Sequence, residues 1–105
     1  MKAYESIFIV KPQMDDASLN ELINKYEALI IKNEGTILKK ENWGLKTMAY
    51  EIRRNRQGFY IQFHFQAPET IVRTLENSYR IDENIIRYIT VCLTNSESAQ
   101  YQINQ

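Results

Sequence analysis

The sequence has little cysteine and histidine, two residue types that carry much of protein redox and metal chemistry. Cys92 is the single cysteine and His64 the single histidine in a chain of 105 residues. One thiol cannot form an internal disulfide, and these two side chains cannot complete a zinc site of four ligands. We therefore expect no metal and no other cofactor, and the cysteine usage fits a reducing cytoplasm.

A recognisable catalytic arrangement is also missing from the sequence. Asp15 and Asp16 are adjacent acids, but two carboxylates that open a helix usually cap it and complement its dipole. His64 falls on the polar side of an expected strand, with no serine, cysteine or aspartate at a spacing typical of nucleophilic catalysis. The sequence thus predicts a protein that is not an enzyme and has no small-molecule substrate.

Net charge and long apolar runs are lacking as well. Thirteen Lys plus Arg balance thirteen Asp plus Glu, so the whole chain has no electrostatic attraction to nucleic acid or to an anionic membrane. The apolar runs in the first ten residues are short and end at Lys11-Pro12, which is typical neither of a secretory signal nor of a membrane span. We expect a soluble cytoplasmic protein without a membrane partner, in which any anionic ligand meets a local basic patch.

Four segments have the residue types and periodicity of strands or of a first helix. Residues 3–10 are rich in aromatic and β-branched types and stop at a proline, which predicts a strand. Asp15 or Asp16 caps a helix that ends near residues 33–35. Residues 36–52 form one long extended segment, in which Gly44 predicts a bend or bulge. After a turn at residues 54–58, four apolar side chains alternate with polar ones and predict a strand with one buried face: Phe59, Ile61, Phe63 and Phe65.

A second helix and a last strand complete the pattern. Pro68 is placed at the first position of the helix, and residues 85–93 form the strand. The inward face of the helix is Ile71, Val72, Leu75 and Tyr79. The order strand, helix, strand, strand, helix, strand predicts an α+β fold, the ferredoxin-like βαββαβ sandwich, with a four-stranded antiparallel sheet and two helices on one face. We assign residues 1–94 to this single domain and residues 95–105 to a flexible tail.

The predicted sheet has more apolar surface than two helices can cover. In the first strand Tyr4, Phe8 and Val10 alternate with Ile7 and Ile9. In the last strand Ile86, Tyr88 and Cys92 alternate with Ile85, Ile89, Val91 and Leu93. The uncovered face is either a partner surface or a set of scattered exposed aliphatic side chains of the kind that ordinary proteins carry.

Positive charge is concentrated in the segment GLKTMAYEIRRNRQGFY, residues 44–60. Lys46, Arg53, Arg54 and Arg56 lie there with one acid, Glu51. Arginines beside the turn of a hairpin can reach phosphates without desolvating the core, and the guanidinium matches phosphate in a two-pronged contact. A solvated loop is the alternative. Base stacking by residues 59–65 is disfavoured, because the aromatic side chains of that strand share its core face.

The same segment resembles a known family. Trp43-Gly44-Leu45-Lys46, followed by residues 49–52 (AYEI), is similar to the second strand of the bacterial small-subunit ribosomal protein six family. Further matches are Tyr4-Glu5, Gly35, Gln57-Gly58-Phe59, Ala67-Pro68, Arg80-Ile81, Asn84 and Arg87. Three residues depart from the family pattern: Thr47, Met48 and Glu51.

The resemblance implies a structural protein of the small ribosomal subunit. Such a protein binds the central domain of 16S ribosomal RNA as a heterodimer with small-subunit ribosomal protein eighteen, and Tyr50 and Ile52 help to build its second strand. The expected RNA contacts are Lys2, Tyr4, Lys46, Arg53, Arg54, Arg56, Arg80 and Arg87. The expected partner contacts on the open sheet face are Ile7, Ile9, Ile89 and Val91. The alternative is a protein-interaction or ligand-sensing domain of the same fold that self-associates through this face.

Overall fold

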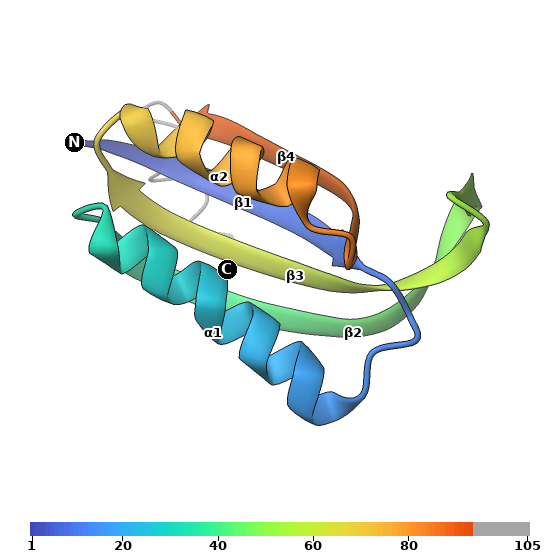
Figure 1. The fold of residues 1–105 in the computed structure, drawn as a ribbon. Coiled ribbons are helices and arrows are strands. Elements are labelled where there is room, and N and C mark those ends of the chain that lie inside the picture. The colour runs from blue at the N-terminus through green and yellow to red at the C-terminus, as the bar shows by residue number, and fades with distance from the viewer. Residues whose placement is uncertain (94–105) are drawn as a thin grey trace.

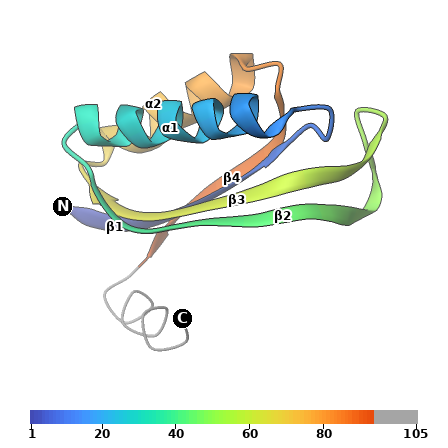
Figure 2. The same ribbon diagram turned by 90° about the horizontal axis from the view of Figure 1, so that it is seen from below.

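The elements of a computed structural model, which describes residues 1–93, follow the predicted order. They are β1 (Lys2–Val10), α1 (Asp16–Lys32), β2 (Thr36–Ile52), β3 (Asn55–Ala67), α2 (Thr70–Ile81) and β4 (Ile85–Leu93). The strands form one antiparallel sheet in the order β2-β3-β1-β4, and both helices cover the same face (Figures 1 and 2). The ferredoxin-like prediction is confirmed. The boundary predicted at residue 94 and the tail predicted for residues 95–105 lie outside the described residues.

Helix α1 begins and ends where its flanking residues satisfy the free backbone groups. The Asp15 carboxylate accepts a hydrogen bond from the Ser18 backbone N–H at 2.7 Å, and this bond lowers the pKa of Asp15. At the other end the Asn33 backbone N–H donates to the carbonyls of Leu29 and Ile30. Between the caps, one stripe is buried against the sheet: Leu19, Leu22, Ile23, Tyr26 and Ile30.

Helix α2 starts slightly later than predicted. Pro68 precedes it, and the Pro68 carbonyl accepts from the Ile71 backbone N–H at 3.0 Å. Ile71, Leu75 and Tyr79 are buried as expected, whereas Val72 is only half-buried. The helix therefore presents a narrower apolar stripe than its sequence predicted.

The core between sheet and helices is built around aromatic side chains. The Phe8 ring lies 5.4 Å from the Tyr26 ring and 5.1 Å from the Tyr79 ring, measured between centroids. Burying a side chain of this size stabilises the fold by about 1.5–3 kcal/mol. The Tyr79 hydroxyl would be costly to bury alone, and it lies 2.8 Å from the Ser6 hydroxyl. Of the four residues on the predicted core face of β3, Ile61, Phe63 and Phe65 are fully buried here and Phe59 is half-buried against this core. The prediction that this strand has one buried face was wrong, because Gln62 and His64 on the opposite face are buried as well.

The β2–β3 hairpin is longer and its turn tighter than predicted. Gly44 has a φ of 82° at a register shift next to Asn42, which confirms the predicted bend. Ile52 pairs with Asn55, so the turn consists of Arg53 and Arg54 alone. The predicted turn at residues 54–58 was wrong, because Asn55, Gln57 and Gly58 already pair with β2. In both views the hairpin extends beyond the ends of β1 and β4 (Figures 1 and 2).

The open face of the sheet has a small apolar cluster of its own. Ile9, Met48 and Ile86 form it, with Ile52 and Tyr60 packed against them. Ile86 is the extra residue of a bulge, since Ile9 pairs with Arg87 and Val10 with Ile85. The prediction that Ile85 shares a face with Ile89 and Val91 was wrong for this reason: the bulge turns Ile85 into the main core and Ile86 onto the open face.

Gly58 permits the close approach of β3 and β1 beneath this cluster. A Cβ atom at position 58 would lie 2.3 Å from Cγ2 of Ile9. Any larger residue would therefore displace Ile9 from its place on the open face.

Candidate nucleic-acid interface

The hairpin carries most of the positive charge predicted to meet RNA. Lys46 lies in β2 opposite Gly58, Arg53 and Arg54 form the turn, and Arg56 follows in β3. All four side chains are exposed. Glu51 is the one acid of the segment, and its carboxylate is 4.0 Å from Nε of Arg56 with both side chains largely in solvent. Four basic side chains against one acid leave the hairpin with a net positive charge, and such an exposed pair screens it little.

The turn fixes where its two arginines point. Both have positive φ, 48° for Arg53 and 67° for Arg54, as a two-residue turn between antiparallel strands requires. Nη1 of Arg53 donates to the Ile85 carbonyl at 3.4 Å, and Nδ2 of Asn55 donates to the Arg53 carbonyl at 3.0 Å. Arg53 thus ties the hairpin to the start of β4, while the Arg54 side chain makes no hydrogen bond or ion pair within residues 1–93.

Arg87 lies at the base of the hairpin, on the open face. Its Nη1 donates to the Tyr50 hydroxyl at 2.7 Å and so links β4 to β2. Tyr50 was expected to help build the second strand, but its side chain is 61% exposed. Its contact with Arg87 was not foreseen, because the extra β2 residues between the pairs Thr47–Gln57 and Ile52–Asn55 follow no simple alternation.

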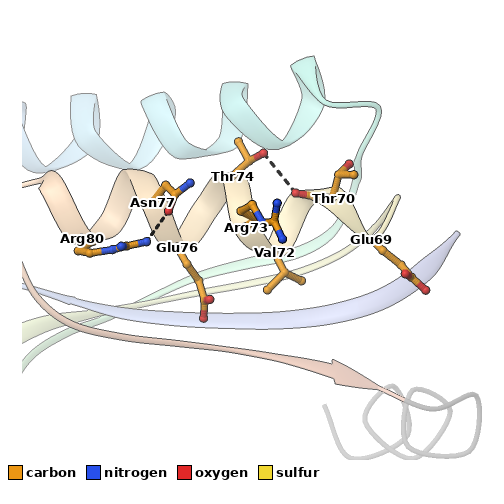
Figure 3. A pocket seen from close by; sticks show the side chains of 8 residues that line it. All are labelled: Glu69, Thr70, Val72, Arg73, Thr74, Glu76, Asn77 and Arg80. Atoms are coloured by element: carbon orange, nitrogen blue, oxygen red, sulfur yellow. Dashed lines mark hydrogen bonds between the residues drawn. The ribbon is translucent and has the colours of Figure 1, made fainter.

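Arg80 belongs to the helix layer. It lies in the last turn of α2, at the end of the sheet from which the hairpin projects, and donates to the side-chain oxygen of Asn77 (Figures 1 and 3). The hollow on this side of α2 is lined by both basic and acidic side chains, among them Arg73, Glu69 and Glu76 (Figure 3). It therefore offers no uniformly positive surface for an anion.

Lys2 is separated from the hairpin by the length of β1 (Figure 1). It forms an exposed ion pair with Glu69, which raises the pKa of Lys2 and lowers that of Glu69. Glu69 offsets part of the positive charge of Lys2, and Lys2 lies at the far end of β1, so this residue does not extend the basic surface of the hairpin.

The structure corrects the prediction for Tyr4. Its side chain is 3% exposed, lies among the core residues and stacks on Phe65 with 5.8 Å between ring centroids. A side chain packed in this way is not available to RNA. Tyr4 alternates with Ile7 and Ile9 as expected, and this alternation places it beneath the helices.

The four expected partner contacts share the open face. Ile7 pairs with Ile89 across β1 and β4, Ile9 pairs with Arg87, and Glu5 pairs with Val91. The side chains of Ile89 and Val91 are 56% and 39% exposed, whereas Ile9 is buried among the other residues of the open-face cluster. Three of them line a groove of about 380 Å³, and Val91 lies beyond it along β4.

Sequence reasoning missed the β2 and β3 side of this groove. Met48, Ile52 and Tyr60 belong to its apolar lining, and Tyr50 and Arg87 line it as well. Met48 is buried even though its neighbours Thr47 and Ala49 are both exposed. A methionine in so polar a segment was the available signal. The irregular register of β2 at this point meant that the sequence could not show which face of the sheet Met48 occupies.

Within residues 1–93, no helix is long and apolar enough to cross a membrane. In the same part of the chain, no three His, Cys, Asp or Glu side chains gather in a way that could hold a metal ion.

Known proteins resemble this chain over nearly its whole length. The family model of ribosomal protein S6 matches residues 3–92. The small ribosomal subunit protein bS6 of Azobacteroides pseudotrichonymphae is 38% identical over 90 residues, which cover 86% of this chain and 80% of that protein. The bS6 protein of a Nostoc species is 39% identical over 88 residues, or 84% of this chain and 82% of the relative.

A solved structure agrees with both fold and family. The crystal structure of 30S ribosomal protein S6 from Thermotoga maritima superposes with a TM-score of 0.87 at 28% identity, and the match covers 99% of this chain and 98% of the other. Each of these proteins carries the name of a ribosomal component, and none carries the name of an enzyme. The resemblance found in the sequence is confirmed, and the chain belongs to the ribosomal protein S6 family of the small ribosomal subunit.

Proposed function

We propose that this chain is a structural protein of the small subunit of the cytoplasmic ribosome that binds the central domain of 16S ribosomal RNA together with small-subunit ribosomal protein eighteen. One observation carries the proposal: a chain without net charge has four exposed basic side chains on a single hairpin, which extends beyond the ends of β1 and β4. Phosphate contacts of this kind position a protein on RNA without reading its bases.

The hairpin residues Lys46, Arg54 and Arg56 are the primary phosphate contacts. Arg53 contributes charge at the turn and holds the turn near β4 through the Ile85 carbonyl. Arg80 faces the same end of the molecule and is a secondary contact, and Lys2 is a peripheral contact that must first exchange Glu69 for phosphate. Arg87 lies apart from these residues, beside the groove.

The open face is the surface for protein eighteen. Ile7, Ile9, Ile89 and Val91 lie on it together, and the helices leave it uncovered (Figure 2). An exposed apolar patch of this kind favours a protein partner over solvent. A basic partner would supply many of the remaining phosphate contacts, which is consistent with the neutrality of this chain.

A second candidate function follows from the same exposed face. The chain could self-associate there as an interaction or ligand-sensing domain of the same fold. Sedimentation velocity of the purified chain, alone and with protein eighteen, separates the two. The proposal expects a monomer that forms a one-to-one complex with protein eighteen, whereas a stable homodimer that ignores protein eighteen would support the alternative.

Assembly on RNA is tested by adding the central-domain fragment of 16S RNA to the purified chain, to protein eighteen and to both. We expect the two proteins together to bind the fragment far more tightly than either alone. Equal binding of the chain alone and of the pair would contradict the proposed joint recognition.

A further inference from the structure

The groove on the open face combines an apolar floor with a single charged side chain. Ile7, Ile9, Met48, Ile52, Tyr60 and Ile89 supply most of its apolar lining, and among residues 1–93 Arg87 is the one charged residue that lines it. The Arg87 side chain is exposed and is held by the Tyr50 hydroxyl. A guanidinium has five N–H donors in a fixed plane, so one bond to Tyr50 leaves most of them free for an anion.

No acid among residues 1–93 lines the groove, and three acids elsewhere on the sheet have contacts away from Arg87. The Glu5 carboxylate accepts from Nε2 of Gln62 at 2.8 Å, and Glu41 forms an ion pair with Lys39 at 2.6 Å. Glu51 lies beside Arg56. Among residues 1–93, Arg87 has no carboxylate within ion-pair distance. A cation at the edge of an apolar groove, with no acid of the described residues bound to it, complements an anion that a ligand would bring.

We infer that the groove binds a protein segment that presents an apolar side chain beside a carboxylate, the apolar group entering among Ile7, Met48 and Ile89 and the carboxylate pairing with Arg87. The inference rests on the proposed function, because protein eighteen is the partner expected to carry this segment. Arg87 was predicted to contact RNA, and the inference assigns it to the protein interface instead. There its charge would determine which segment of the partner binds and how that segment is aligned along the groove.

A carboxylate fits the position better than an RNA phosphate. Apolar side chains flank Arg87 on the open face: Ile9 is its pairing partner in β1, and Ile89 lines the groove two residues further along β4. An RNA backbone offers no apolar group for such a groove, whereas a peptide offers both parts on adjacent residues. Closing the groove over the pair would also exclude water and strengthen a two-pronged contact between Arg87 and the carboxylate.

The test measures binding of protein eighteen, without RNA, to Arg87→Gln, Arg87→Lys and Ile89→Asp variants by titration calorimetry. Arg73→Gln is the matched control, since it removes the same charge from an exposed position on α2. We expect Arg87→Gln and Ile89→Asp to weaken binding about tenfold or more, as when a charged or central group is removed from an interface. Arg87→Lys should weaken it less, and Arg73→Gln should match the unmodified chain. Thermal unfolding of each variant checks that the fold is intact.

Reversal of the charges identifies the anion. Arg87→Glu should abolish binding, and lysine at one Asp or Glu of protein eighteen should restore it. If Arg87→Gln and Arg73→Gln bind protein eighteen with equal affinity while Ile89→Asp binds it weakly, the inference about Arg87 is overturned. The proposal that the open face binds protein eighteen would still stand. A different result would identify a phosphate as the anion. If Arg87→Gln binds protein eighteen normally, but its complex with protein eighteen binds RNA more weakly than the parent complex, the inference is overturned. Failure of the unmodified chain to bind protein eighteen would contradict the proposed function itself, and the inference with it.

Discussion

Arg53 and Arg54 occupy the two central positions of the β2–β3 turn, and both have positive φ. Turns of this type favour Asn-Gly, because residues with a Cβ atom and longer side chains are strained there. A left-handed conformation costs such a residue about 1–2 kcal/mol. The two arginines therefore lower the stability of the turn and place two guanidinium groups at the tip of the hairpin. Backbone strain of this kind is common at binding sites.

Replacing the turn by Asn-Gly should separate stability from binding. We expect Arg53→Asn/Arg54→Gly to raise the free energy of unfolding by about 1–2 kcal/mol, since the strain that it removes at two positions outweighs the loss of the long hydrogen bond from Arg53 to the Ile85 carbonyl. The same variant should bind RNA more weakly in the presence of protein eighteen. Urea unfolding and a filter-binding titration measure the two effects. Arg53→Lys/Arg54→Lys keeps charge and strain, so it should gain no stability, and an Asn-Gly variant that binds RNA as well as the parent would refute a role for the turn.

The buried hydroxyl pair in the core makes a second prediction. Tyr79→Phe removes the partner that lies 2.8 Å from the Ser6 hydroxyl and leaves Ser6 only Thr90, whose hydroxyl is 3.0 Å away. Removal of one buried hydrogen bond should lower the free energy of unfolding by about 1 kcal/mol. Tyr50→Phe is the control for a hydrogen bond in solvent: it removes the exposed bond from Arg87 and should change stability by less than about 0.5 kcal/mol. If Tyr50→Phe lowered the free energy of unfolding more than Tyr79→Phe does, the buried hydrogen bond between Tyr79 and Ser6 would be contradicted.

His64 makes a prediction about pH. It is buried on the open face between Glu5 of β1 and Lys39 of β2, with which it pairs. Burial lowers its pKa, Lys39 lowers it further, and Glu5 partly offsets both. Because the folded-state pKa is below the unfolded value of about 6.5, the unfolded chain binds more protons. The stability that this histidine contributes is complete above about pH 6.5 and is lost as the pH falls from there through the folded pKa.

Urea unfolding of the parent chain and of His64→Gln at several pH values measures this contribution. The parent should lose more stability than the variant between about pH 7 and pH 5, since both chains share every other titrating group. Parallel pH curves would show that His64 does not contribute.

The sequence predicted the fold well because its periodic signals came from burial. The alternation in residues 59–65 marks the face of β3 that packs in the main core, where Ile61, Phe63 and Phe65 are buried as predicted. The sequence predictions were wrong where the strands are interrupted by a turn or a bulge and the alternation of side chains between the two faces breaks down. A two-residue turn at Arg53-Arg54 and a bulge at Ile86 depend on pairing between strands, which a local pattern does not contain.

The candidate site was predictable in composition but not in arrangement. Charge counting found the hairpin arginines, but it could not show that Glu69 pairs with Lys2 or that Tyr4 stacks on Phe65 in the core. The groove depends on Met48 and Tyr50, which reach the open face through an irregular part of β2. Such contacts between distant segments appear only once the chain is folded.

The measurement that tests the account most directly is the salt dependence of RNA binding by the chain with protein eighteen. We compare the parent with Arg53→Ala/Arg54→Ala/Arg56→Ala and with a control, Lys25→Ala/Lys32→Ala/Arg73→Ala, that removes equal charge from the helices. The hairpin variant should bind more weakly, and the slope of log affinity against log salt should flatten by up to about 0.9 for each phosphate that the variant no longer neutralises. The control should keep the parent's slope. A hairpin variant with the affinity and slope of the parent would contradict the claim that this hairpin meets RNA.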